Sequence, residues 1–187
     1  LRDDTRKNKE VLDYLKTERN YHDEWIKTQS NVSKSFFKKL IEYIPAKDES
    51  LKIKRDGFYY FSESLKKNEY RKYYRSKKKT SKKELILDIN KLAKNKKFYQ
   101  VSGVSPSKDN QMLAYAEDIN GRREYTIKVK HIKSRKNLKD KISGTDGQFI
   151  WSKDSKNIVY IKRDETTLTS NKVFLHKIGS LQKNDIL

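Results

Sequence analysis

The chain has 187 residues, of which 34% are hydrophobic and 37% charged, and its formal net charge is +20. The absence of cysteine excludes disulfides and thiolate metal sites and fits a reducing compartment. No apolar run is long enough for a transmembrane helix and no signal peptide is visible, so no membrane partner is expected.

The first 46 residues show helical periodicity. One face of a first helix carries apolar and aromatic residues at helical spacing, namely Val11, Leu15, His22, Trp25 and Ile26. A second short helix is predicted from Ser33 to Tyr43, with Ser33 as its N-cap and Pro45 after its end. We therefore expect residues 1–46 to form a helical segment.

Near Gly57 the pattern changes to short aromatic and β-branched runs. Residues 58–61 and 69–75 are predicted to form a hairpin, and residues 85–87 a further strand. A turn or single helical turn is expected at residues 88–93.

Short strands are predicted to continue to the end of the chain, over residues 98–101, 112–116, 123–132, 150–151, 158–161 and 173–178. Asn120-Gly121 is a strong hairpin turn signal before the cleanly alternating strand. Short strands at near-regular spacing favour a sandwich, a barrel or a propeller.

Two similar segments repeat at the spacing of propeller blades. Residues 105–115 and 151–160 each run from a small-residue turn through a polar stretch to an apolar strand that ends in Tyr. Ser105 and Ser152 lie 47 positions apart, and a four-stranded blade takes about 40–50 residues. The sequence therefore predicts a mainly β fold, a partial and about three-bladed β-propeller over residues 50–187, preceded by the helical segment.

The positive charge raises nucleic acid as a partner. Lysine outnumbers arginine and is scattered among Asp and Glu, whereas bidentate phosphate contacts favour arginine. This pattern favours a lysine-rich composition over a nucleic-acid interface. The densest run, residues 71–83, is interpreted as a strand followed by a solvated loop, although Tyr73 and Tyr74 could stack on bases. A basic nucleic-acid-binding protein and a protein-interaction module remain the alternatives.

No catalytic, cofactor-binding or metal-binding residue is predicted within the chain, and no G-x-S-x-G nucleophile motif is present. His22 is interpreted as a core or interface histidine, His131 as a surface residue and His176 as a structural strand residue. Residues 88–90 and 154–157 carry oxygen ligands without EF-hand spacing and are interpreted as turn residues.

Ten segments carry a family resemblance, over residues 2–6, 11–21, 57–60, 67–70, 85–90, 104–107, 113–118, 120–127, 150–154 and 176–179. In this order they resemble the N-terminal part of the prolyl oligopeptidase family of serine peptidases, and most closely its oligopeptidase B branch. The resemblance covers nearly the whole chain.

The resemblance implies a cytosolic-type peptidase that cleaves short peptides, after Arg or Lys in the oligopeptidase B branch. A seven-bladed propeller would cover an α/β-hydrolase domain and filter substrates by size, and residues 1–46 would pack on that hydrolase domain. The family's catalytic Ser, Asp and His lie beyond Leu187. The chain is therefore expected to be a fragment, inert alone, with a structural and gating role. Its partner would be the hydrolase domain, in cis or as a separate chain.

Alone, the fragment would leave sheet edges and one helix face exposed. We therefore expect it to self-associate.

Overall fold

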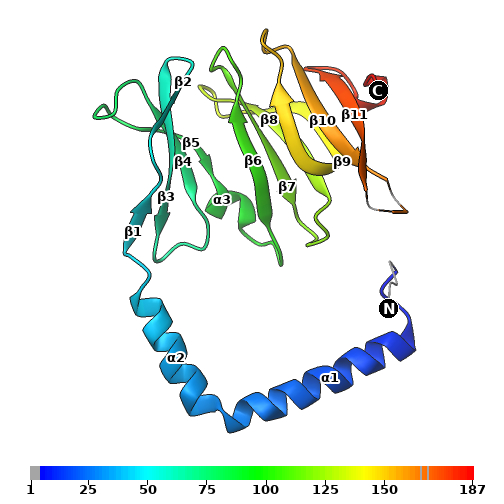
Figure 1. Ribbon diagram of the computed structural model, residues 1–187. Coiled ribbons are helices and arrows are strands. Elements are labelled where there is room, and N and C mark those ends of the chain that lie inside the picture. The colour runs from blue at the N-terminus through cyan, green and yellow to red at the C-terminus, as the bar shows by residue number, and fades with distance from the viewer. Residues whose placement is uncertain (1–4, 165, 168) are drawn as a thin grey trace. The chain divides into compact units, whose positions relative to one another are not determined.

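Two units make up the structure, Leu1–Ala46 and Lys47–Leu187. The computed structural model describes residues 5–164, 166–167 and 169–187. The first unit holds two helices, and the second holds every strand found in these ranges (Figure 1). No helix in the same ranges is long and apolar enough to cross a membrane.

Helix α1 spans Lys9–Thr28 and helix α2 spans Ser30–Glu42. Asn8 is the N-cap of α1, because its Oδ1 accepts a hydrogen bond of 3.2 Å from the backbone N–H of Val11. This bond satisfies one of the donors that the first helical turn leaves without a partner. The helical periodicity of the sequence thus predicted both helices.

The start of α2 differs from the prediction. Ser33 is not an N-cap, since its N–H donates to the carbonyl of Gln29 at 2.9 Å inside the helix. Gln29 is both the C-cap of α1 and the N-cap of α2, and no side chain caps α2. Ser33 is exposed, and an exposed helix interior tolerates serine at little cost. The serine was therefore a poor marker of the boundary.

Neither helix contains a buried side chain. Trp25, Phe36 and Phe37 expose 56%, 62% and 64% of their surface, and Leu15 and Leu40 are also exposed. We call these five residues the apolar helix residues. A group of large exposed apolar side chains of this kind marks an interaction site.

The first sheet is antiparallel and has the order β1-β3-β4-β5, with β2 also paired to β3. Its strands are β1 Lys47–Glu49, β2 Ile53–Arg55, β3 Phe58–Leu65, β4 Lys72–Ser76 and β5 Glu84–Asp88. The predicted hairpin is β3 with β4, in which Phe61 faces Tyr74 and their rings stack at 5.7 Å between centroids. The single helical turn expected next is α3, Ile89–Ala93, which Asp88 caps.

The second sheet holds six antiparallel strands in the order β11-β10-β9-β8-β7-β6. They are β6 Gln100–Pro106, β7 Met112–Asp118, β8 Tyr125–His131, β9 Asn137–Trp151, β10 Asn157–Arg163 and β11 Ser170–Lys177. A 3₁₀ turn, η1 Gln182–Asn184, follows β11. The chain then returns to β11, where Leu175 and Ile186 form a β-bridge.

Strand β9 changes partner at Thr145. This residue faces Tyr125 of β8 and also Lys162 of β10, so the first half of β9 pairs with β8 and the second half with β10. Gly144 and Gly147 flank the change with φ values of +70° and +90°, a region that glycine enters more readily than other residues. The second sheet thus consists of two parts that share β9. One part has four strands, β6 to β9, and the other has three, β9 to β11. With the first sheet they agree with the predicted mainly β, about three-bladed fold.

Two apolar clusters hold the strands together. One lies within the second sheet and includes Ile127, Ile142 and Ile158. The other joins the two sheets, since Leu87 of β5 and Leu113 of β7 belong to the same buried cluster. The second unit therefore has a core that spans both sheets.

Gly147 is a sensitive point of β9. A Cβ atom built there would lie 2.9 Å from the ring atom Cδ2 of Tyr125, and Tyr125 is buried. Gly57 also has a positive φ, of +83°, but a Cβ there would meet nothing within 4 Å. We expect Gly147→Ala to lower the free energy of unfolding by about 3 kcal/mol or more, because it adds a steric clash to a backbone strain of about 1 kcal/mol.

Gly57→Ala is the matched control, with only the strain of about 1 kcal/mol. Urea unfolding of both variants measures the difference. Equal losses in the two variants would contradict the close packing of β9 against β8.

Candidate functional site

Two hydrogen-bonded turns of the same design explain the repeat seen in the sequence. In one, Ser107 Oγ donates to Asp109 Oδ1 at 2.5 Å and accepts from the Met112 N–H at 2.9 Å. In the other, Ser152 Oγ donates to Asp154 Oδ1 at 2.6 Å and accepts from the Asn157 N–H at 2.9 Å. The structural repeat is therefore 45 residues, from Ser107 to Ser152.

The sequence repeat treated Ser105 and Ser152 as equivalent positions. This was wrong by two residues, because the equivalent of Ser152 is Ser107. Ser105 lies inside β6 and faces Ala114, whereas Ser152 lies in the turn after β9. Serine occurs at both positions 105 and 107, so composition alone could not choose the register. The interpretation of residues 154–157 as a turn is confirmed, because Asp154 Oδ1 also accepts from the backbone N–H of Lys156.

Five turns lie at one end of the two sheets, and we call this the turn end. They comprise residues 56–57, 77–83, 107–111, 132–136 and 152–156. Hydrogen bonds join three of these turns to the 107–111 turn. Asn110 Nδ2 donates to the Asp56 carbonyl at 2.6 Å, the Ile132 N–H to the Gln111 carbonyl at 2.9 Å, and the Asp109 N–H to Ser155 Oγ at 3.0 Å. Arg75 Nη1, at the end of β4 and just before residues 77–83, donates to the Asn110 carbonyl at 2.6 Å. These bonds fix residues 56–57, 132–136 and 152–156 relative to the 107–111 turn.

A buried histidine lies between two buried carboxylates. His176 of β11 has Nε2 at 3.1 Å from Asp140 Oδ1 and Nδ1 at 2.7 Å from Asp185 Oδ1. Asp140 also accepts from the Gly179 N–H at 2.5 Å, and Asp185 accepts from the Tyr160 hydroxyl at 2.8 Å. Each ring nitrogen of His176 thus has a buried carboxyl oxygen within hydrogen-bond distance.

This histidine cluster is closed to substrate. His176 is fully buried and the Asp140 side chain is 2% exposed. Burial, with the hydrogen bond to Asp185, raises the pKa of Tyr160 to about 12. The cluster ties β9, β10 and β11 to the segment after η1, so the structural interpretation of His176 agrees with its position.

The other two histidines stand apart from it. His131 is exposed at the end of β8, as predicted. His22 is exposed on α1, and its Nδ1 lies 3.1 Å from Asp23 Oδ1. His22 is therefore not a core residue of its own unit, and its interpretation as an interface residue stays a prediction. The reason is that its unit buries no helix side chain against which His22 could pack.

A second buried polar group lies on β7. Glu117 accepts from Lys128 Nζ and from the Tyr99 hydroxyl, each at 2.5 Å. Burial alone would raise the pKa of Glu117, but these two donors outweigh it and hold that pKa below its ordinary value. Burial, together with the hydrogen bond to Glu117, raises the pKa of Tyr99. All of these partners lie on paired strands or next to them, so the group stabilises the sheet.

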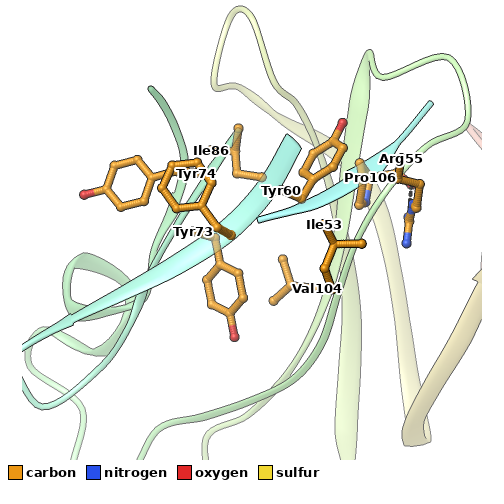
Figure 2. A pocket seen from close by; sticks show the side chains of 9 residues that line it. Ile53, Arg55, Tyr60, Tyr73, Tyr74, Ile86, Val104 and Pro106 are labelled. Atoms are coloured by element: carbon orange, nitrogen blue, oxygen red, sulfur yellow. Dashed lines mark hydrogen bonds between the residues drawn. The ribbon is translucent and has the colours of Figure 1, made fainter. Parts of the chain in front are cut away.

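A small cavity of about 130 Å³ lies between the two sheets (Figure 2). Strands β2 to β5 supply most of its lining and β6 supplies Val104 and Pro106. Arg55 Nη2 crosses from β2 to β6 by donating to Ser105 Oγ at 3.0 Å and to the Pro106 carbonyl at 3.1 Å. Apart from Arg55 the lining is apolar and aromatic, which indicates packing between blades.

No metal site emerges from the described residues, since they contain no group of three or more His, Asp or Glu side chains placed to hold an ion. Asp88 Oδ1 accepts from the Asn90 N–H at 3.1 Å and caps α3, as its interpretation as a turn residue predicted. The polar groups described above thus take part in turns, helix caps and contacts between strands. Their role is to stabilise the fold.

The whole chain, residues 1–187, matches the family model described as the N-terminal β-propeller domain of prolyl oligopeptidase. The chain belongs to the prolyl oligopeptidase family. Oligopeptidase B from Leishmania major shares 30% identity and superimposes with a TM-score of 0.92 over 99% of this chain. The family resemblance in the sequence is therefore confirmed.

Two curated relatives agree with this assignment. Dipeptidyl aminopeptidase BI of Pseudoxanthomonas mexicana is 30% identical over 100% of the chain, and protease 2 of Moraxella lacunata is 26% identical over 97%. The chain covers 28% and 27% of their lengths, and 26% of the Leishmania major enzyme. It thus corresponds to the N-terminal propeller part of these longer proteins.

Proposed function

We propose that this chain belongs to an oligopeptidase B-like serine peptidase that cleaves short peptides after Arg or Lys. An α/β-hydrolase domain would supply the catalytic Ser, Asp and His, and the described blades would narrow the path of peptides to them. The observation that carries this proposal is the similarity to Leishmania major oligopeptidase B, with a TM-score of 0.92 over 99% of the chain. A cytoplasmic location belongs to the same proposal.

The apolar helix residues support the presence of a hydrolase domain. Full burial of one large apolar side chain is worth about 1.5–3 kcal/mol, and the described part of the first unit buries none of its helix side chains. A domain that covers Trp25, Phe36 and Phe37 would recover that free energy. Residues 1–46 would then belong structurally with the hydrolase domain, and residues 50–187 with the propeller.

A dipeptide-releasing peptidase is the second candidate, because dipeptidyl aminopeptidase BI is 30% identical over the whole chain. Two reporter substrates separate the candidates. One is an N-blocked peptide with Arg before the reporter amide, and the other is a free dipeptide amide without a basic residue. We expect the full-length protein to cleave the first substrate with a kcat/KM at least about tenfold higher, because only this substrate has a basic residue at the cleavage site. Its blocked N-terminus excludes dipeptide release.

Inhibition by a serine-directed phosphonate is the control for the reaction type. Preference for the free dipeptide would favour the second candidate. Absence of phosphonate-sensitive cleavage of either substrate would reject both.

A further inference from the structure

The turn end carries a dense group of cations. Residues 77–82 include four lysines, residues 133–136 two lysines and an arginine, and residues 153–156 two lysines, all exposed. Within the described ranges, none of these nine side chains lies within ion-pair distance of a carboxylate. The strand pairings and the hydrogen bonds between turns place these cations at the same end of the two sheets.

The carboxylates at the same end already have partners. Asp109 and Asp154 each accept from a serine hydroxyl and a backbone N–H of their own turn. Glu84 lies 2.7 Å from Arg75 Nε, and Asp56 lies within 4.0 Å of both Arg55 and Lys108. The five turns together contain eleven Lys and Arg residues and three Asp residues, so the turn end keeps a net positive charge.

A cleft of about 680 Å³ opens at this end. It is lined by Arg75, Asn110, Gln111, His131, Lys133 and Ser134, and no carboxylate contributes to its lining. The Arg75 guanidinium is held by Glu84, by the Asn110 carbonyl and by the ring of Phe58 beneath it. The cleft thus combines the exposed cation of Lys133 with a firmly held wall that contains no carboxylate, which suits an anionic chain.

We propose that the turn end binds acidic peptide segments. Eight of the nine unpaired cations are lysines, which attract carboxylates as point charges. The described residues of the five turns include no exposed aromatic side chain on which a base could stack. This favours a peptide over single-stranded nucleic acid. The identification of the bound chain as a substrate rests on the proposed function.

Binding is tested on the full-length protein with its reactive serine blocked. The probe is a fluorescein-labelled peptide of eight Glu residues separated by Gly, which contains no cleavage site. We expect anisotropy to show binding that weakens steeply as salt is raised from 50 to 300 mM, because the Debye length falls over that range. Lys133→Glu with Lys136→Glu should raise Kd at least about tenfold.

The control variant is Lys94→Glu with Lys97→Glu, which makes the same change in net charge. These exposed lysines precede β6 and lie at the end of the second sheet opposite the turn end. Gln100 faces Asp118 at their end of the β6–β7 pair, and Pro106 faces Leu113 at the other. We expect Kd in this variant to stay within about twofold. Equal weakening in both variants, or no binding by the unmodified protein, would overturn the proposal. Tighter binding of an oligonucleotide of equal charge would replace peptide with nucleic acid.

Cleavage gives an independent readout on the unblocked enzyme. Two peptides share one Arg cleavage site and differ only in a distal segment, which is Glu-rich in one and Gly/Ser-rich in the other. We expect a several-fold higher kcat/KM for the acidic peptide, an advantage that Lys133→Glu with Lys136→Glu abolishes. Equal cleavage of the two peptides would reject the substrate role. If neither peptide is cleaved, the proposed function fails, and the anisotropy result still decides whether the turn end binds acidic chains.

Discussion

Replacing His176 by leucine is expected to lower the free energy of unfolding by about 3–5 kcal/mol, the usual cost of removing one partner from a buried ionic group. The reason is that Asp140 and Asp185 would remain buried after losing the donor that lies between them. The strongest effect should fall on β11 and the segment after η1. Urea unfolding measures the total loss, and hydrogen exchange of the Ser170–Lys177 amides locates it.

His131→Leu is the matched control, because His131 is exposed at the end of β8. A surface substitution of this kind changes stability by about 0.5 kcal/mol or less. The loss of unfolding free energy in His176→Gln should lie between those of the two leucine variants, since a glutamine amide can donate to one of the two carboxylates. Equal stability of the leucine variants at positions 131 and 176 would show that the histidine cluster does not hold β11 in place.

The isolated 187-residue chain is expected to self-associate at micromolar concentration through the apolar helix residues. Trp25→Ser, Phe36→Ser and Leu40→Ser together should convert it to a monomer, because these side chains are 56%, 62% and 48% exposed and offer the apolar area that association would bury. Size-exclusion chromatography with light scattering measures the mass as a function of concentration.

The control replaces exposed apolar residues of the second unit by serine, with Leu51→Ser and Ile150→Ser. These side chains are 86% and 66% exposed, and we expect the variant to associate as the unmodified chain does. A monomeric unmodified chain with one sharp cooperative melt would contradict the view that the helices need a covering domain. Loss of association in the control variant alone would place the contact on the sheets.

The sequence allowed the helices and most strands to be predicted because periodicity marks them directly. Strand β9 was predicted only at its last two residues, since residues 137–149 contain two glycines and many polar side chains. Its pairing depends on a change of partner at Thr145 that no local pattern records. Strands β1 and β2 have three residues each, too few for alternation to be seen.

The histidine cluster could be predicted only in part. His176 was recognised as structural, but Asp140 lies 36 residues away in sequence and reaches it only through the sheet. One signal was present. Asp140 stands between Leu138 and Ile142 at the inward positions of β9, where an aspartate is costly unless it has partners. An acidic residue in an apolar register therefore marks a buried polar contact.

We propose above all that this chain works within a serine peptidase. The most direct test labels a native extract with a fluorophosphonate probe for reactive serines, isolates every protein that carries peptides of this chain, and measures the intact masses. We predict a labelled protein several times heavier than 22.3 kDa, or a labelled hydrolase that co-purifies with the chain. A protein of 22.3 kDa with neither a label nor a labelled partner would contradict the claim.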